Sequence, residues 1–363
     1  MKLGFGLYRH HVTPENLAFA RQCGATHVVV HLVDYFKGAA DNPRGDQPTG
    51  GRGGWGRAGD PERLWDVDEL LDMRRLIESQ GLIWYAIENF DPAHWHDVLL
   101  DGPQRPAQIE KLQTMIRTVG AAGISVIGYN FSLAGVAGRI SGPFARGSAV
   151  GSGMSGVDQT PIPRGMVWNM VYDPDGEGDL EPVGREVLWD RYARFLEDVL
   201  PVAEEAGVIL AAHPEDPPVP IIRGQPRVLY ESTHFRRLVG LNPSRSNQID
   251  FCLGTVGEMA DGGVYEAVEE QSRQHRIAYM HFRNIRGKVP DYRETFIDEG
   301  DTDMLRVIRI LQANAFDGVL IPDHAPQMSC DAPWHAGMAF AMGYMAAAIQ
   351  ASGNSGPDSP RGL

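Results

Sequence analysis

The stretch GVILAAHPEDPP, residues Gly207 to Pro218, decides the fold prediction. Its apolar run, Val208 to Ala212, is too short and too unbroken for an amphipathic helix, so it predicts a buried strand. Pro217 and Pro218 cannot continue a hydrogen-bonded ladder, which places His213 at the carboxyl end of that strand. We therefore expect a buried strand to bring a histidine, followed by two carboxylates, to the edge of a sheet.

Three later apolar stretches also deliver polar side chains at their ends. QIDFCLG contains Cys252, IAYMHFRN contains His281, and GVLIPDHAP contains Asp323. Because the carboxyl ends of parallel barrel strands meet at one face, these residues and His213 are expected to converge there. One such histidine or cysteine is more often a packed side chain than a ligand, but four at successive strand ends indicate a divalent metal site. The thiolate favours Zn²⁺ or Fe²⁺, whereas an open site with a carboxylate also suits Mn²⁺.

Strands and helices alternate along the rest of the chain. Strands are predicted near residues 2–8, 26–35, 82–89, 124–131, 208–212, 248–254, 277–284 and 318–326, and the helices between them include 64–80, 106–122 and 185–206. Eight alternations favour an α/β fold of the (β/α)8 TIM barrel type over a doubly wound sheet. Neither a GxGxxG after the first strand nor a GxxxxGK[ST] motif is present, so a dinucleotide or P-loop site is not expected.

Two glycine-rich stretches interrupt this alternation. Residues 37–60 and 132–181 have few periodic apolar positions, so they are predicted to be long loop insertions at the carboxyl-terminal face, the second a candidate lid. Residues 1–351 are then expected to form one barrel domain that closes with a helix over 335–350. The Gly-, Ser- and Pro-containing stretch 352–363 is predicted to be a flexible tail.

The composition narrows the class of protein. The 363 residues are 43% hydrophobic and 22% charged, and no apolar run approaches the length of a membrane span. A net charge of −14 without a basic cluster disfavours a nucleic-acid partner. Three cysteines and the absence of an export signal in the first residues predict a cytoplasmic protein.

Further candidate site residues lie beside the predicted ligands. His324 follows Asp323 and is the first choice for a general acid or base, because imidazole exchanges protons near neutral pH. Arg283 and Asn284 follow His281 and offer a guanidinium for a carboxylate and an amide for a hydroxyl. The remaining candidates end other strands: Glu88, assigned to catalysis, and Tyr129, Asn130 and His31, assigned to substrate binding.

Several short motifs together resemble the mannonate dehydratase family of the xylose-isomerase-like barrel superfamily. They are IEN at 87–89, YNF at 129–131, HPEDPP at 213–218, FCLGT at 251–255, HFRN at 281–284, GDTDM at 300–304 and PDH at 322–324. The resemblance implies Mn²⁺ (or Fe²⁺) bound by His213, Cys252, His281 and Asp323, with His324 in proton transfer. It also implies removal of water from D-mannonate to give 2-dehydro-3-deoxy-D-gluconate, and a homo-oligomer.

The chain departs from the family pattern around the expected substrate. SLAGVAGRISG follows YNF where the family has an Asp-Trp-x-Arg-Thr segment, and Ala325-Pro326 follows PDH in place of Gly-His. We therefore expect a metal-dependent dehydratase acting on a sugar acid or related polyol. The alternatives are a metal-dependent sugar isomerase or epimerase, a β-eliminating lyase on a keto sugar or glycoside, a hydrolytic metal enzyme, and a barrel whose metal is structural or absent.

Overall fold

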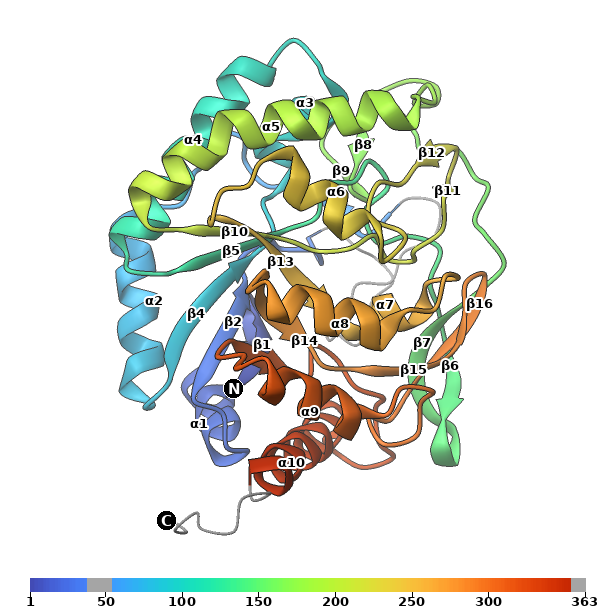
Figure 1. The fold of residues 1–363 in the computed structure, drawn as a ribbon. Coiled ribbons are helices and arrows are strands. Elements are labelled where there is room, and N and C mark those ends of the chain that lie inside the picture. The colour runs from blue at the N-terminus through green and yellow to red at the C-terminus, as the bar shows by residue number, and fades with distance from the viewer. Residues whose placement is uncertain (38–53, 354–363) are drawn as a thin grey trace.

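A computed structural model describes residues 1–37 and 54–353, and its centre is a closed barrel of eight parallel strands. Around the barrel the strand order is β1-β17-β14-β13-β10-β5-β4-β2. The predicted (β/α)8 fold is confirmed (Figure 1). The barrel strands are β1 (Lys2–Tyr8), β2 (His27–His31), β4 (Ile83–Glu88), β5 (Val126–Tyr129), β10 (Ile209–Ala212), β13 (Asn247–Cys252), β14 (Ile277–His281) and β17 (Val319–Ile321).

Helices surround the barrel and cover its outer face (Figure 1). Local signals explain where they begin and end: the Thr13 hydroxyl accepts a hydrogen bond from the backbone of Asn16 at the start of α1, and left-handed Gly207 ends α5. The long helices are α1 (Pro14–Gln22), α2 (Val67–Ser79), α4 (Arg105–Ala121), α5 (Arg185–Ala206), α8 (Val264–Arg273), α9 (Met304–Ala313) and α10 (Pro333–Gly353). Three short helices had no predicted counterpart: α3 (His96–Leu100), α6 (His234–Leu241) and α7 (Leu253–Glu258).

Apolar side chains fill the barrel below its carboxyl-terminal end. Val29, Ala86, Val126 and Ala211 pack there with the ring of Tyr279. A Cβ atom on Gly128 would lie 2.1 Å from the Tyr279 hydroxyl, so only glycine leaves room for that ring. Because side chains alternate in direction along a strand, residues two positions further on point into the barrel at its carboxyl-terminal end.

Small sheets are built from the chain beyond the barrel strands. The predicted insertion 132–181 supplies β6 (Ile140–Ala145) and β7 (Ala149–Ser155), which join β16 (Asp291–Thr295) and β15 (Asn284–Lys288) in one antiparallel sheet. It also supplies β8 (Met166–Val167) and β9 (Met170–Val171), which pair with each other, and β9 pairs in turn with β3 (Gly56–Arg57). This segment is therefore more regular than the sequence predicted. Its many glycines interrupt the alternation of apolar residues that would predict strands. Later in the chain, β11 (Ile221–Ile222) and β12 (Gln225–Pro226) form a separate two-stranded sheet.

Parts of the two remaining segments lie outside the described residues. Of the predicted insertion 37–60, residues 38–53 are not described, and the predicted tail 352–363 is described only through Gly353, where α10 ends. Three 3₁₀ turns complete the regular structure, at Arg9–His11, Pro92–His94 and Arg146–Ser148. Within residues 1–37 and 54–353, no helix combines the length and apolar character that crossing a bilayer requires.

Candidate functional site

Four predicted metal ligands converge at the carboxyl-terminal end of the barrel. Cys252 and His281 end the adjacent strands β13 and β14 and are partners in the strand register, and His213 directly follows β10. One ligand atom from each of these three residues lies within 4.8 Å of the others. Asp323 follows β17, and its Oδ2 atom lies 3.4 Å from His281 Nδ1. The parallel register thus brings together residues that are far apart in the sequence.

The electrostatics of this cluster favour a bound cation. Burial by itself would raise the pKa of Cys252, but Arg283, His213 and His281 lower it well below its usual value, which favours the thiolate. Burial would lower the pKa of His281, but Asp250, Asp323 and Glu88 raise it well above its usual value. In the described part of the chain, both buried ring nitrogens of His281 lack a hydrogen-bond partner. Buried polar atoms are normally satisfied, so this donor set fits a shared metal ion.

Asp250 belongs to the same cluster and was missed in the sequence. With Glu88 and His281 it forms a second group whose ligand atoms lie within 4.8 Å of one another. Tyr279 donates a hydrogen bond to its Oδ2 atom at 3.0 Å. Burial, together with the charge of Glu88, raises the pKa of Asp250 to about 7. The available signal was the two-residue period of QIDFC, which points Asp250 to the same side of β13 as Cys252.

Glu88 and His31 lie beside this cluster on the neighbouring strands β4 and β2. The Oε2 atom of Glu88 is 3.4 Å from His281 Nε2 and 3.6 Å from His31 Nε2. Burial would raise the pKa of Glu88, but the two imidazoles lower it to about 2, so the group is a carboxylate. His31 Nδ1 also lies 3.2 Å from the hydroxyl of Tyr35. Both predicted residues line the pocket described below.

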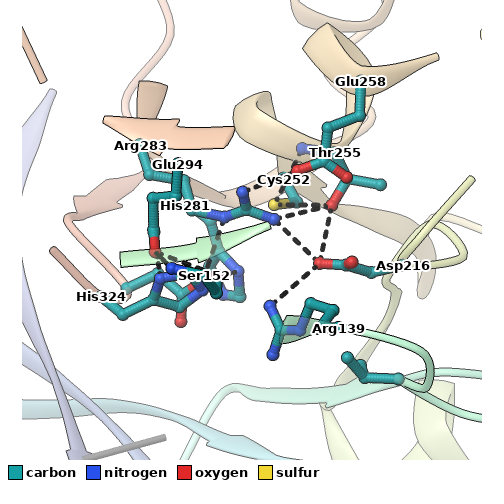
Figure 2. A network of polar contacts seen from close by, with 12 residues as sticks. Arg139, Ser152, Asp216, Cys252, Thr255, Glu258, His281, Arg283, Glu294 and His324 are labelled. Carbon is teal, nitrogen blue, oxygen red and sulfur yellow. Dashed lines mark hydrogen bonds and ion pairs between the residues drawn. The ribbon is translucent and has the colours of Figure 1, made fainter. Parts of the chain in front are cut away.

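His324 is held between two carboxylates, and Figure 2 shows it beside one of them, Glu294. Its Nδ1 atom contacts Glu294 of β16, and its Nε2 atom lies 3.2 Å from Asp323 Oδ2. Glu294 in turn accepts hydrogen bonds from the backbone and hydroxyl of Ser152 in β7, at 3.2 and 3.1 Å. Asp323 has a left-handed backbone, with φ at 61°, a conformation that is uncommon outside glycine and recurs at functional sites. Glu294 and Ser152 carried no sequence signal, because they reach His324 from outside the barrel.

Arg283 occupies a different position from the one predicted for a substrate ligand. Its guanidinium is buried and donates to Glu258 and Asp216 at 2.9 Å and to Thr255 at 3.1 Å (Figure 2). Its Nε atom is 3.6 Å from Asp323 Oδ2. Burial and the charge of Asp216 raise the pKa of Glu258 to about 8. Arg283 does not line the pocket. Its two terminal nitrogens hold the loop after β10 and helix α7 beside the ligand cluster.

Two other predicted substrate residues, Tyr129 and Asn284, do not line the pocket. For Tyr129 the alternation of side chains along the strand explains why. Tyr129 lies one position after Gly128, so it points outward, where its hydroxyl lies 2.9 Å from that of Tyr192. Asn284 lies beyond the end of β14, and its amide is used by the backbone: it donates to Ile297 and Thr302 and accepts from Ile285 and Thr302. Neither side chain lines the pocket.

Asn130 does line the pocket, but its amide is also engaged. Its Nδ2 atom donates to the backbone oxygens of His213 and Pro214 at 3.2 and 3.1 Å. Its Oδ1 atom accepts a hydrogen bond from Trp168 Nε1 at 3.2 Å. Asn130 therefore connects the backbone of a candidate ligand to the opposite wall of the pocket.

The pocket has two unlike halves around an empty space of about 530 Å³ that includes its open mouth. The donor half carries the titratable groups Glu88, His213, His281, Asp323 and His324. The aromatic half is formed by Tyr8, Tyr35, Trp55 and Trp168, with ring centroids 5.4 Å apart for Tyr35 and Trp55 and 5.5 Å apart for the two tryptophans. Such a pocket suits a small ligand with several oxygens at one end.

Comparisons with known proteins agree with this architecture. The family model described as D-mannonate dehydratase (UxuA) matches residues 1–137 and 178–351. A mannonate dehydratase of Streptococcus suis (strain 05ZYH33) is 32% identical over 276 residues, which are 72% of this chain and 75% of that protein. A mannonate dehydratase of Streptococcus pneumoniae (strain 70585) is 31% identical over the same shares.

Solved structures give the same result. The crystal structure of mannonate dehydratase from Streptococcus suis serotype 2 superimposes with a TM-score of 0.77 at 26% identity, covering 99% of this chain and 97% of that one. An L-ribulose 3-epimerase, with a TM-score of 0.58 at 14% identity and 99% of both chains covered, shares the fold alone. The ordered family match over both parts of the barrel shows that this chain belongs to the D-mannonate dehydratase family.

Proposed function

We propose that this protein is a metal-dependent hydro-lyase that removes water from D-mannonate or a closely related sugar acid and yields a 2-keto-3-deoxy acid. The observation that carries the proposal is the convergence of His213, Cys252 and His281. Among the described residues neither ring nitrogen of His281 makes a hydrogen bond, although each lies 3.4 Å from a carboxylate. Membership of the D-mannonate dehydratase family supports the choice of reaction. The chain's own departures after YNF and after PDH leave the exact sugar acid to experiment.

The residues that would hold the ion are His213, Cys252, His281 and Asp323, and Mn²⁺ or Fe²⁺ suits this mixture of nitrogen, sulfur and oxygen donors. When bound, a divalent ion supplies a Lewis acid that makes the C2 proton of the substrate more acidic. Asp250 lies close enough to His281 to hold its imidazole in place, since the two side chains are 3.4 Å apart.

Two side chains carry the proton transfers in this proposal. Glu88 is a carboxylate in the pocket and accepts the proton from C2. His324 gives a proton to the hydroxyl that leaves C3, so that water departs and an enol remains, which becomes the keto acid. Glu294 accepts from Nδ1 of His324, which keeps Nε2 directed to the side of Asp323. Asp323 has two roles here, as a candidate ligand and as a neighbour of the proton donor.

The test combines metal content with product analysis. We expect about one Mn or Fe per chain by elemental analysis of the purified protein, lost in Cys252→Ala but retained in Cys330→Ala, a matched control because Cys330 is a free, exposed thiol. The metal-loaded protein is then incubated with D-mannonate and a panel of other sugar acids, and 2-keto-3-deoxy acids are detected. Metal retained in Cys252→Ala would overturn the ligand assignment.

Mass analysis of the products separates the candidate reactions. Loss of one water mass supports the dehydratase. An unchanged mass with deuterium taken up from the solvent would identify an isomerase or epimerase instead, since that reaction returns the proton. Metal without any product from the panel would overturn the proposed substrate class.

A further inference from the structure

An arginine lines the pocket from a segment that the family model does not match. Arg139 lies directly before β6, within residues 138–177, between the two matched ranges. Gly138 turns the chain immediately before it with φ at 71°, and a Cβ atom there would be 3.2 Å from both Asp158 and Ile222. The side chain of Arg139 keeps only 10% of its exposure and lines the pocket with the donor half. A buried guanidinium at this place needs a partner.

The carboxylate paired with Arg139, that of Asp216, forms no hydrogen bond with its guanidinium. Asp216 Oδ2 accepts from Arg283 at 2.9 Å and from Thr255 at 3.4 Å, and its Oδ1 accepts from Tyr292 at 3.4 Å. Arg139 approaches the same Oδ2 atom only to 3.6 Å, as an ion pair (Figure 2). The charge of Asp216 is therefore shared by both arginines, but only Arg283 forms a hydrogen bond with it.

The two arginines differ in what remains of their bonding capacity. The two terminal nitrogens of Arg283 donate to Glu258, Asp216 and Thr255. Over residues 1–37 and 54–353, the side chain of Arg139 has the 3.6 Å ion pair and no hydrogen bond. A planar guanidinium has five N–H donors in a fixed fork that matches a carboxylate. Arg139 thus presents unused, charged donors to the pocket.

We propose that Arg139 binds the carboxylate of the substrate and selects acids over neutral polyols. This inference rests on the proposed function, because it names what recognises the acid group of a sugar acid. The same segment supplies Trp168 to the aromatic half, so residues 138–177 contribute both a charged anchor and part of the wall. The substrate then lies between Arg139 and the donor half, with its carboxylate held in a bidentate contact.

The experiment measures binding by titration calorimetry on the metal-loaded protein in a His324→Asn background, which is expected to slow conversion of the acid during the titration. The ligands are matched pairs such as D-mannonate and D-mannitol, and D-gluconate and D-glucitol. We expect Arg139→Gln to weaken binding of the preferred acid by about tenfold or more and to leave binding of its polyol unchanged. Arg139→Lys keeps the charge but not the fork, so an intermediate loss is expected. Arg164→Gln is the control, since Arg164 lies in the same segment, is 56% exposed and does not line the pocket.

Two outcomes would overturn the inference. The first is a protein with Arg139 intact, in the same background, that binds no acid of the panel more tightly than its polyol. The second is an equal change in the affinities for acid and polyol in Arg139→Gln or Arg139→Lys, which would mean that the substitution only disturbs the fold. Melting temperatures of both variants measure such a disturbance directly. Failure of the proposed function gives a different result. If acid binding depends on Arg139 but no water is released, the dehydratase reaction is refuted while the role of Arg139 in binding the carboxylate stands.

Discussion

The donor half and the aromatic half of the pocket are built in different ways. Candidate ligands in the donor half are placed by adjacent barrel strands, whose register brings Cys252 beside His281 and His281 beside Ile321, directly before the Asp323 loop. Apart from Tyr8, which ends β1, the aromatic half comes from connections outside the barrel strands: Tyr35 follows β2, Trp55 directly precedes β3, and Trp168 lies between β8 and β9. Barrel strands hold reactive groups rigidly, whereas loops vary more readily. The candidate ligands and most of the aromatic wall thus come from structurally different parts of this chain.

Polar side chains join the two halves at Asn130 and at His31. Asn130 binds the backbone of His213 and Pro214 with its amide nitrogen and Trp168 with its amide oxygen. His31 lies 3.2 Å from the Tyr35 hydroxyl through Nδ1 and 3.6 Å from Glu88 through Nε2. Both links pass through single side chains. Substitutions in the two halves should consequently affect different kinetic quantities, and the following predictions test that separation.

The largest effect is expected from His324→Asn in the donor half. Loss of the proton donor should lower kcat by about 10²–10⁴-fold, while elemental analysis finds the metal content unchanged. Glu294→Gln is the companion variant: it removes only the group that orients Nδ1, so we expect a smaller loss of about tenfold in kcat. Loss of the metal in His324→Asn would contradict the separation of proton transfer from metal binding.

Trp168→Ala should act on the aromatic half alone. Without the indole, which packs 5.7 Å from Tyr35 and 5.5 Å from Trp55 between ring centroids, we expect KM to rise by about tenfold with kcat and metal content retained. Trp168→Phe keeps a ring but removes the hydrogen bond to Asn130, so it separates packing from that link. A Trp168→Ala protein that loses its metal would show that the halves are not independent.

The smallest effects on activity are expected from the two predicted residues that lie outside both halves. Asn284→Ala leaves buried backbone groups unpaired and should lower the free energy of unfolding by about 2–4 kcal/mol, measured by urea denaturation. Tyr129→Phe removes one hydroxyl contact with Tyr192 and should cost about 1 kcal/mol or less. KM and metal content should stay at wild-type values in both. A changed KM in a variant whose free energy of unfolding equals that of the wild type would indicate that the residue does contact the substrate.

The sequence identified those site residues that a local pattern marks, and it missed those that only contacts distant in the chain bring to the site. His213, Cys252, His281 and Asp323 were visible because each ends an apolar run, which is a local pattern. Arg139 lies directly before β6 and Glu294 lies in β16, both strands of the four-stranded sheet outside the barrel. No apolar periodicity in the sequence there indicates which way their side chains point. Arg283 was correctly placed near the ligands, but a residue type alone does not tell whether a guanidinium contacts a substrate or three buried protein groups.

The sequence by itself determined the barrel, its strand ends and the order in which candidate ligands meet, because alternating apolar runs and prolines act locally and parallel strands must share one face. A cytoplasmic location and self-association remain predictions from that sequence. Only the tertiary structure decided which polar groups are already paired. It placed Asp250 beside His281, turned Tyr129 away from the pocket and left Arg139 with unused donors. The physical reason is that hydrogen-bond saturation depends on neighbours distant in the chain, which no local pattern encodes.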